Sequence, residues 1–348
     1  MSRFMKNSLA DLIPYTPGEQ PSKKMIKLNT NENPYPPSPA VEKILENMDE
    51  DKGRLYSDPQ ASAAKKAIAG YYGIRPDQTI MFNGSDEGLA MSFMAFGENI
   101  CFPEISYSFY KVFARVFSRK YSMIPLKKDF TIDPDDYIRS TGTVLIANPN
   151  APTGIALDPD QIERIVASDK DRMVIVDEAY IDFGGETCTG LIDKYDNLLV
   201  IQTMSKSRSL AGLRIGYAMS SSDIIKDLDR IRYSFNPYNM NALSIAAAEA
   251  AMNDREYFRE TSEKIMKTRE MTVSELRKLG LDILPSKANF IFVKGGPDYY
   301  EKLKEKNILA RYWNESPLSD WVRISIGTWE EMKELVKATK EISCEKAR

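Results

Sequence analysis

The stretch Asn197-Leu-Leu-Val-Ile-Gln-Thr-Met-Ser-Lys-Ser-Arg-Ser-Leu-Ala-Gly-Leu-Arg-Ile-Gly-Tyr-Ala218 indicates the fold of this chain. It holds two apolar runs, 198–202 and 214–218, joined by a polar connection that carries Lys206. Runs that are apolar throughout, rather than alternating, are typical of strands covered on both faces of a sheet. A nucleophilic lysine needs a fixed position and a reason to lose its proton. Most lysines are solvated surface charges, so the rest of the chain decides what Lys206 does.

Similar apolar runs and helical patterns alternate through the first two thirds of the chain. Further strands are expected at 79–82, 99–102, 143–147 and 173–176, and helices between them at 86–96 and 158–167. Strands that alternate with helices predict an α/β fold in three layers, with a mostly parallel sheet.

The character of the sequence changes near residue 239. Helices are expected at 241–252, 256–279 and 329–341, and short strands at 289–293, 308–311 and 321–325. We therefore predict a large α/β domain over residues 38–245. A smaller α+β domain would combine residues 246–348 with an N-terminal arm, residues 1–37.

Composition excludes several classes of function. The 348 residues contain no histidine, which excludes Ser-His-Asp and Cys-His catalysis and histidine-ligated metal within this chain. A net charge of -3 argues against binding to nucleic acid or to an acidic membrane surface. No apolar stretch is long enough for a membrane span or typical of a signal peptide. Three scattered cysteines have no metal-ligand spacing and favour a cytoplasmic location.

Polar motifs follow the predicted strands, where ligands bind in open parallel sheets. Gly84-Ser-Asp-Glu-Gly88 opens a helix and suits a phosphate cradle, although it also suits an ordinary capped helix. Asn148-Pro-Asn-Ala-Pro-Thr-Gly154 is a rigid turn that is either structural or presents an amide to a ligand. Ser106-Tyr107 offers a ring for stacking or for the core. The stretch Asp177-Glu-Ala-Tyr180 brings a carboxylate that could pair with a pyridine nitrogen. It could equally be an ordinary surface loop. Together with Lys206, the order of these motifs along the chain indicates a binding site for a flat, phosphorylated aldehyde.

With these motifs in place, the chain resembles the fold-type-I aminotransferases that use pyridoxal 5'-phosphate. The resemblance runs from about residue 28 to 328, and within the family it is greatest to the branch that acts on histidinol phosphate. Its most specific stretches are Leu28-Asn-Thr-Asn-Glu-Asn-Pro-Tyr-Pro-Pro37, Tyr56-Ser-Asp-Pro59, Gly84–Gly88, Asp177–Tyr180, Ser205–Arg214 and Val322-Arg-Ile-Ser-Ile-Gly-Thr328.

The resemblance implies a role for each matching residue. Lys206 would form the Schiff base with the cofactor and move the substrate proton. Asp177 would pair with the pyridinium nitrogen, and Tyr180 would bond the ring oxygen. Tyr107 would stack on the ring. The phosphate site would be lined by Ser85, Asp86, Ser205 and Arg214.

The resemblance also implies substrate contacts and a homodimer. Arg323 would bind the carboxylate of glutamate, and Arg311 the second anion, including the substrate phosphate. Asn33 and Tyr35 would contribute to substrate binding. Tyr56 would reach the cofactor phosphate of a neighbouring subunit.

One position departs from the family. Many members have Asn-Asn-Pro-Thr-Gly where this chain has Asn150-Ala-Pro-Thr-Gly154. The expected ring-contacting amide is absent at Ala151, and Asn150 would have to replace it from one position earlier.

The predicted function is therefore amino transfer between histidinol phosphate and 2-oxoglutarate or glutamate, in histidine biosynthesis. A threonine-phosphate decarboxylase and an aromatic amino acid aminotransferase remain alternatives on the same scaffold. A regulator that binds pyridoxal phosphate without catalysis is a rival of another class, but the short, proline-rich opening segment does not resemble a DNA-binding module. A nucleotide-binding α/β protein is a further alternative, but the sequence contains neither a Walker loop nor the glycine motif of dinucleotide-binding proteins.

Overall fold

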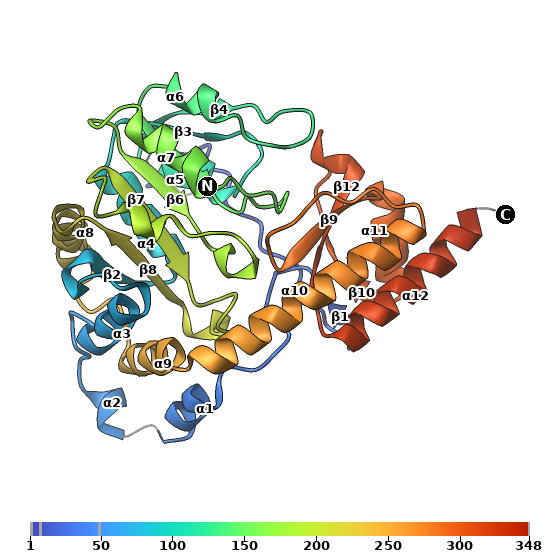
Figure 1. The fold of residues 1–348 in the computed structure, drawn as a ribbon, viewed down its shortest axis with the longest axis horizontal. Coiled ribbons are helices and arrows are strands. Elements are labelled where there is room, and N and C mark those ends of the chain that lie inside the picture. The colour runs from blue at the N-terminus through green and yellow to red at the C-terminus, as the bar shows by residue number, and fades with distance from the viewer. Residues whose placement is uncertain (1–2, 7–8, 48–49, 347–348) are drawn as a thin grey trace.

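The computed structural model describes residues 3–6, 9–47 and 50–346. The chain forms a large α/β part and a smaller part, with the long helix α10 (Arg255–Lys278) running between them (Figure 1). No helix in the described residues is long and apolar enough to cross a membrane. The mostly parallel, layered fold predicted from the sequence is confirmed by the sheet.

A seven-stranded sheet organises the large part, in the order β2-β8-β7-β6-β5-β3-β4. Its strands are β2 (Thr79–Asn83), β3 (Asn99–Pro103), β4 (Lys120–Ile124), β5 (Thr143–Ala147), β6 (Val174–Asp177), β7 (Leu198–Thr203) and β8 (Ile215–Ser220). Strand β8 is antiparallel to both of its neighbours, and the other pairs are parallel. The start of β8 therefore lies at the same edge as the carboxyl ends of the other strands.

Apolar side chains cover both faces of this sheet. In β5, Val144 and Ile146 belong to one core, and Leu145 and Ala147 to the core on the opposite face. The first core also contains residues of α1 (Pro39–Glu46), α3 (Ser62–Tyr72), α6 (Pro134–Ile138), α7 (Pro159–Ala167) and α9 (Ala242–Asn253). The second contains residues of α4 (Ser85–Ala95), α5 (Phe109–Val116) and α8 (Ser222–Phe235). Burial on both faces explains why the interior strand β5 is apolar from Val144 to Ala147.

The smaller part has its own core. Its three-stranded antiparallel sheet has the order β11-β12-β9. The elements are β9 (Phe290–Lys294), α11 (Gly296–Glu305), β10 (Ile308–Leu309), β11 (Arg311–Tyr312), β12 (Trp321–Ser325) and α12 (Trp329–Lys346). The predicted boundary at 245/246 cuts helix α9, yet α9 buries Ala247 and Ala251 in the large core. The packing thus divides the chain after α9, where α10 begins.

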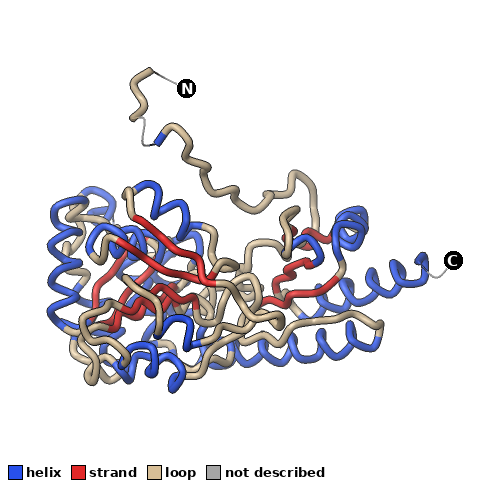
Figure 2. The backbone as a smooth tube through the Cα atoms, turned by 90° about the horizontal axis from the view of Figure 1, so that it is seen from above, coloured by secondary structure: helices blue, strands red, loops and turns tan. Residues whose placement is uncertain are grey.

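The N-terminal chain runs along the outside of both parts as an extended coil (Figure 2). Strand β1 (Ile26–Lys27) pairs with β10 in the smaller part. Further toward the N-terminus, the ring of Tyr15 stacks on Phe109 of the large part, with ring centroids 4.5 Å apart. Helix α2 (Glu50–Arg54) completes the set of helices and strands.

A glycine lets β8 and α4 approach closely at the carboxyl edge. A β-carbon on Gly216 would lie 2.3 Å from the backbone nitrogen of Ser85 and 2.5 Å from the carbonyl carbon of Gly84. Those neighbours are backbone atoms, which cannot rotate away as a side chain can. Gly216 therefore fixes the first turn of α4 directly over β8.

We expect Gly216→Ala to lower the free energy of unfolding by about 1–3 kcal/mol, because the added methyl group overpacks a backbone contact. Gly70→Ala in helix α3 is the matched control, since nothing lies within 4 Å of its added β-carbon. There the substitution should stabilise the protein by about 0.5–1 kcal/mol. Urea unfolding of both variants measures the difference, and equal stabilities would contradict the packing argument.

Candidate active site

A cavity of about 450 Å³ lies at the carboxyl edge of the large sheet, where the smaller part and the N-terminal chain meet it. Most of the residues expected to form the site line it: Ser85, Asp86, Tyr107, Asp177, Tyr180, Ser205, Lys206, Arg214, Arg311 and Arg323. The cavity is thus assembled from five strand ends, as the order of the motifs predicts.

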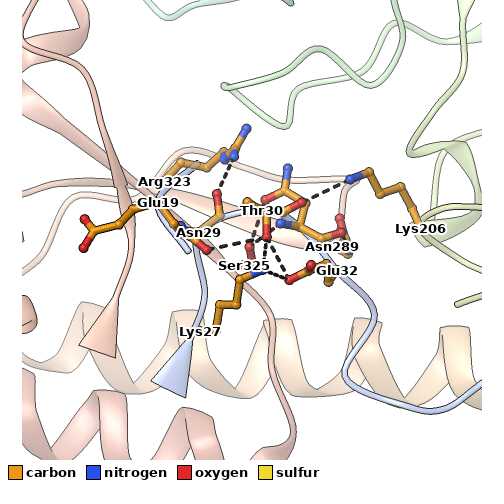
Figure 3. A network of polar contacts seen from close by, with 10 residues as sticks. Glu19, Lys27, Asn29, Thr30, Glu32, Lys206, Asn289, Arg323 and Ser325 are labelled. Atoms are coloured by element: carbon orange, nitrogen blue, oxygen red, sulfur yellow. Dashed lines mark hydrogen bonds and ion pairs between the residues drawn. The ribbon is translucent and has the colours of Figure 1, made fainter. Parts of the chain in front are cut away.

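Lys206 lies in the loop after β7, and its amine reaches into this cavity. The Nζ atom donates a hydrogen bond of 3.1 Å to the carbonyl of Thr30 (Figure 3). Burial, and then the nearby positive charge of Arg323, lower the pKa of Lys206 to about 8 from its ordinary value of 10.5. The amine can therefore gain and lose a proton close to neutral pH.

Asp177 ends strand β6 and is almost fully buried. Its Oδ2 accepts a hydrogen bond of 2.8 Å from the hydroxyl of Tyr110, and its Oδ1 one of 3.2 Å from the backbone N–H of Ala179. Burial raises the pKa of Asp177 to about 6, which those hydrogen bonds only partly offset. No ion pair to Asp177 occurs among the residues that the structure describes. A protonated ring nitrogen is the kind of partner that this carboxylate lacks.

The start of α4 and the loop after β7 lie together in the cavity wall. No side chain caps α4 at Gly84, so its first N–H groups are left to bind a ligand. Arg214 lies beside this helix end and pairs with Asp86 at 3.1 Å. Asp86 also accepts a hydrogen bond of 3.0 Å from the hydroxyl of Tyr107. Ser205 completes the group, in contact with the hydroxyl of Thr203 at 3.0 Å.

Two arginines enter the cavity from the smaller part. The Nη2 atom of Arg323 donates to the carbonyl of Asn29 at 2.9 Å, while its buried Nε has no hydrogen-bond partner among the described residues. Arg311 is more exposed and donates to the carbonyls of Thr16 and Pro17, at 2.9 and 3.2 Å. The unpaired Nε of Arg323 suits a carboxylate, and the outer position of Arg311 suits a second anionic group.

Four expected contacts lie outside the cavity wall. The amide of Asn150 donates to the carbonyl of Ile105 and accepts from Ser106, so it braces the wall instead of facing a ligand. Asn33 donates to the backbone carbonyls of Lys206 and Ser207. The other two are Tyr35, which packs on the core of the smaller part, and Tyr56, which is 82% exposed.

Several residues contribute that the motifs did not indicate. Tyr110 holds Asp177, and the backbone carbonyl of Thr30 holds Lys206. The side chain of Asn31 donates a hydrogen bond of 3.0 Å to the hydroxyl of Tyr180. Tyr15 and Trp313 line the mouth of the cavity. Of these residues, only those in the Asn-rich stretch 29–33 could have been found from the sequence, because polar residues seldom cluster in a buried segment without a role.

Comparison with known proteins shows the family to which the chain belongs. The family model for aminotransferase class I and II matches residues 23–338, and the chain belongs to this family. It is 48% identical to the histidinol-phosphate aminotransferase of Clostridium botulinum strain Okra over 98% of this chain and 99% of that protein. The enzyme of that name from Brachyspira hyodysenteriae is 49% identical, with the same coverage.

Solved structures show the same fold. The histidinol-phosphate aminotransferase of Sinorhizobium meliloti, described in complex with pyridoxal-5'-phosphate, has a TM-score of 0.89. Its sequence is 24% identical, and the match covers 99% of both chains. The fold type and the aminotransferase family predicted from the sequence are thereby confirmed.

The lowered pKa of Lys206 predicts its reactivity in the protein without cofactor. Only the neutral amine reacts with an acylating reagent, so the rate of labelling should rise with pH around a midpoint near 8. Exposed Lys226, whose pKa is raised by its hydrogen bond to Asp223, should titrate well above that value in the same sample. Because Arg323 lowers the pKa of Lys206, Arg323→Gln should move the midpoint upward. Peptide mass spectrometry measures both lysines, and a shared midpoint would contradict the assignment.

Proposed function

We propose that this chain is a pyridoxal-phosphate-dependent transaminase that exchanges the amino group between histidinol phosphate and 2-oxoglutarate. The observation that carries the proposal is one cavity that holds a titratable lysine and a buried carboxylate without a cationic partner among the described residues. The relatives of 48–49% identity over nearly the whole chain carry the name of that activity. Histidine biosynthesis is the pathway that this reaction serves, and the cytoplasm is the compartment that we propose.

The residues present fit the cofactor. Lys206 would bind its aldehyde carbon, and Asp177 would hold its ring nitrogen protonated. Tyr107 would lie against the ring, and Tyr180 would bond the ring oxygen. The phosphate would take the start of α4, with Ser85, Ser205 and Arg214. When bound, pyridoxal phosphate supplies an electron sink for the charge that forms on the substrate carbon as its proton leaves.

The chain's own groups then have to move that proton. In a chain without histidine, Lys206 supplies a basic group in the cavity whose pKa, about 8, lies close to neutrality. A base with a pKa near the working pH is both present in its neutral form and strong enough to accept a proton. The Thr30 carbonyl fixes the amine from one side, so Nζ is held at one place in the cavity.

The two arginines divide the recognition of anions. Arg323, stacked near the rings of Phe290 and Trp313 at 5.4 and 5.3 Å, is rigidly placed and would bind the carboxylate of glutamate. Arg311, at the mouth, would bind the group that differs between the substrates, including the phosphate of histidinol phosphate. Its present bonds go to backbone carbonyls, and a doubly charged phosphate is a stronger acceptor for a guanidinium.

A second copy of this chain is the proposed partner. Tyr56 stacks on Tyr238 at 4.4 Å, and both rings are exposed, as is Leu55 beside them. Exposed aromatic groups of this kind mark contact surfaces. In the homodimer that we propose, Tyr56 would reach the cofactor phosphate of the other subunit.

Lys206→Ala should lower transamination between histidinol phosphate and 2-oxoglutarate by about 10²–10⁴-fold, the usual contribution of a positioned acid–base group. The assay follows glutamate formation, and the visible absorption band of the lysine-bound cofactor should be lost. Normal turnover by Lys206→Ala would refute the mechanism. Release of carbon dioxide from threonine phosphate by the unaltered protein would instead support a decarboxylase.

Arg311→Gln should raise the KM for histidinol phosphate by about 10–100-fold, because a charge-assisted bond to phosphate contributes about 1.5–3 kcal/mol. The KM for glutamate should rise less, because its second carboxylate carries a single charge where the phosphate carries up to two. Lys304→Gln is the control, because it removes a positive charge that pairs with Glu19 at the surface and does not line the cavity. Equal effects of Arg311→Gln on both substrates would contradict the division of roles.

A further inference from the structure

Residues 29–33, here called the strap, connect the smaller part to the loop that carries Lys206, and residues 29–31 line the cavity. The backbone carbonyls of two consecutive strap residues bind two cations of the site. The carbonyl of Asn29 accepts from Arg323 at 2.9 Å, and that of Thr30 accepts from Lys206 at 3.1 Å (Figure 3). Consecutive Cα atoms of a chain are about 3.8 Å apart, so these two bonds tie the guanidinium and the amine to adjacent residues of one short segment.

The strap is itself held firmly. Asn31, at its centre, is 1% exposed and has φ of 55°, a conformation that asparagine tolerates better than most residues. Its backbone N–H donates to Ser325 at 2.8 Å, and its carbonyl accepts from Asn289 at 2.9 Å. Its side chain accepts from Ser325 and donates to Tyr180. Every polar group of Asn31 is thus used, which makes this point of the strap costly to move.

The other end of the strap is attached to the lysine loop. The amide of Asn33 donates to the backbone carbonyls of Lys206, at 2.9 Å, and of Ser207, at 3.2 Å. Its Oδ1 accepts from the backbone N–H of Tyr35 at 3.0 Å, which fixes the orientation of the amide. The backbone of the lysine is therefore bound to the same short segment that binds its amine.

We propose that Asn33 is a positioning residue for Lys206, acting through the strap, and that it does not bind substrate. The inference rests on the proposed function, in which Lys206 takes the cofactor and Arg323 the substrate carboxylate. Asn33 fixes the lysine at its backbone and Thr30 fixes it at its amine. The strap therefore fixes the position of the Lys206 side chain relative to that of Arg323. A small displacement of Nζ would misalign the proton transfer without weakening the hold of Arg323 on the substrate.

The test compares Asn33→Ala and Asn33→Asp with the unaltered protein. Asn33→Asp keeps the acceptor for Tyr35 and the size of the side chain, and it removes only the N–H groups that bind the carbonyls of Lys206 and Ser207. In both variants we expect kcat to fall about tenfold, with the KM for glutamate within about twofold. The rate at which cofactor-free protein captures pyridoxal phosphate, followed by its visible absorption band, should fall by a similar factor.

Asn197→Asp is the matched control, because Asn197 also donates to backbone carbonyls, at the opposite end of the same strand β7. It should leave both the capture rate and the ratio of kcat to KM near their original values. A raised KM with unchanged kcat in the Asn33 variants would make Asn33 a substrate-binding residue and overturn the inference. Unchanged kinetics, or equal losses in the Asn197 variant, would overturn it as well. If the unaltered protein captures the cofactor but transfers no amino group, the proposed function fails, while the capture rates still test Asn33.

Discussion

The site depends on holding positive charges in a cavity from which much of the water is excluded. Lys206 and Arg323 both lose solvation there, and the charge of Arg323 raises the cost of charging Lys206. Backbone carbonyls of the strap replace part of the lost water, and the carboxylates of Glu32 and Asp86 favour the charged lysine. The balance leaves the amine of Lys206 with a pKa of about 8. A solvated lysine has a higher pKa, and a deeply buried lysine without a partner has a lower one.

The reversed direction of β8 is what brings the proposed phosphate site to this amine. Because β8 is antiparallel to β7, Arg214 at its start lies at the same edge as Lys206. Gly216, the second residue of β8, then admits the first turn of α4 against the strand. A parallel β8 would begin at the far edge of the sheet. The same two features thus set both the packing of the large part and the position of Arg214 and the start of α4 relative to the lysine.

The strands of the large sheet could be predicted from the sequence where both faces of the sheet are buried. Strands β5, β6 and β7 are apolar except at one or two terminal residues, and their bounds agree with the prediction to within a residue, since both faces are covered. Strand β4 was not predicted, because it lies at the edge of the sheet and Lys120–Ile124 is partly exposed and polar. Residues that follow strands, such as Asp177 and Lys206, line the cavity as expected. Asn150 also follows a strand, but its side-chain amide donates to the carbonyl of Ile105 and to the hydroxyl of Thr153.

The strap shows why the remainder could not be predicted. Asn33 and Lys206 are 173 residues apart, and Asn31 and Ser325 are 294 apart. No periodicity or local spacing connects such pairs, because their contact exists only after both parts have folded and met. A resemblance to a family can mark Asn33 as functional, but it cannot distinguish contact with substrate from contact with the lysine backbone. That distinction is geometric: in this chain the amide of Asn33 points to the carbonyls of Lys206 and Ser207, and the cavity is lined by the lysine and not by the asparagine.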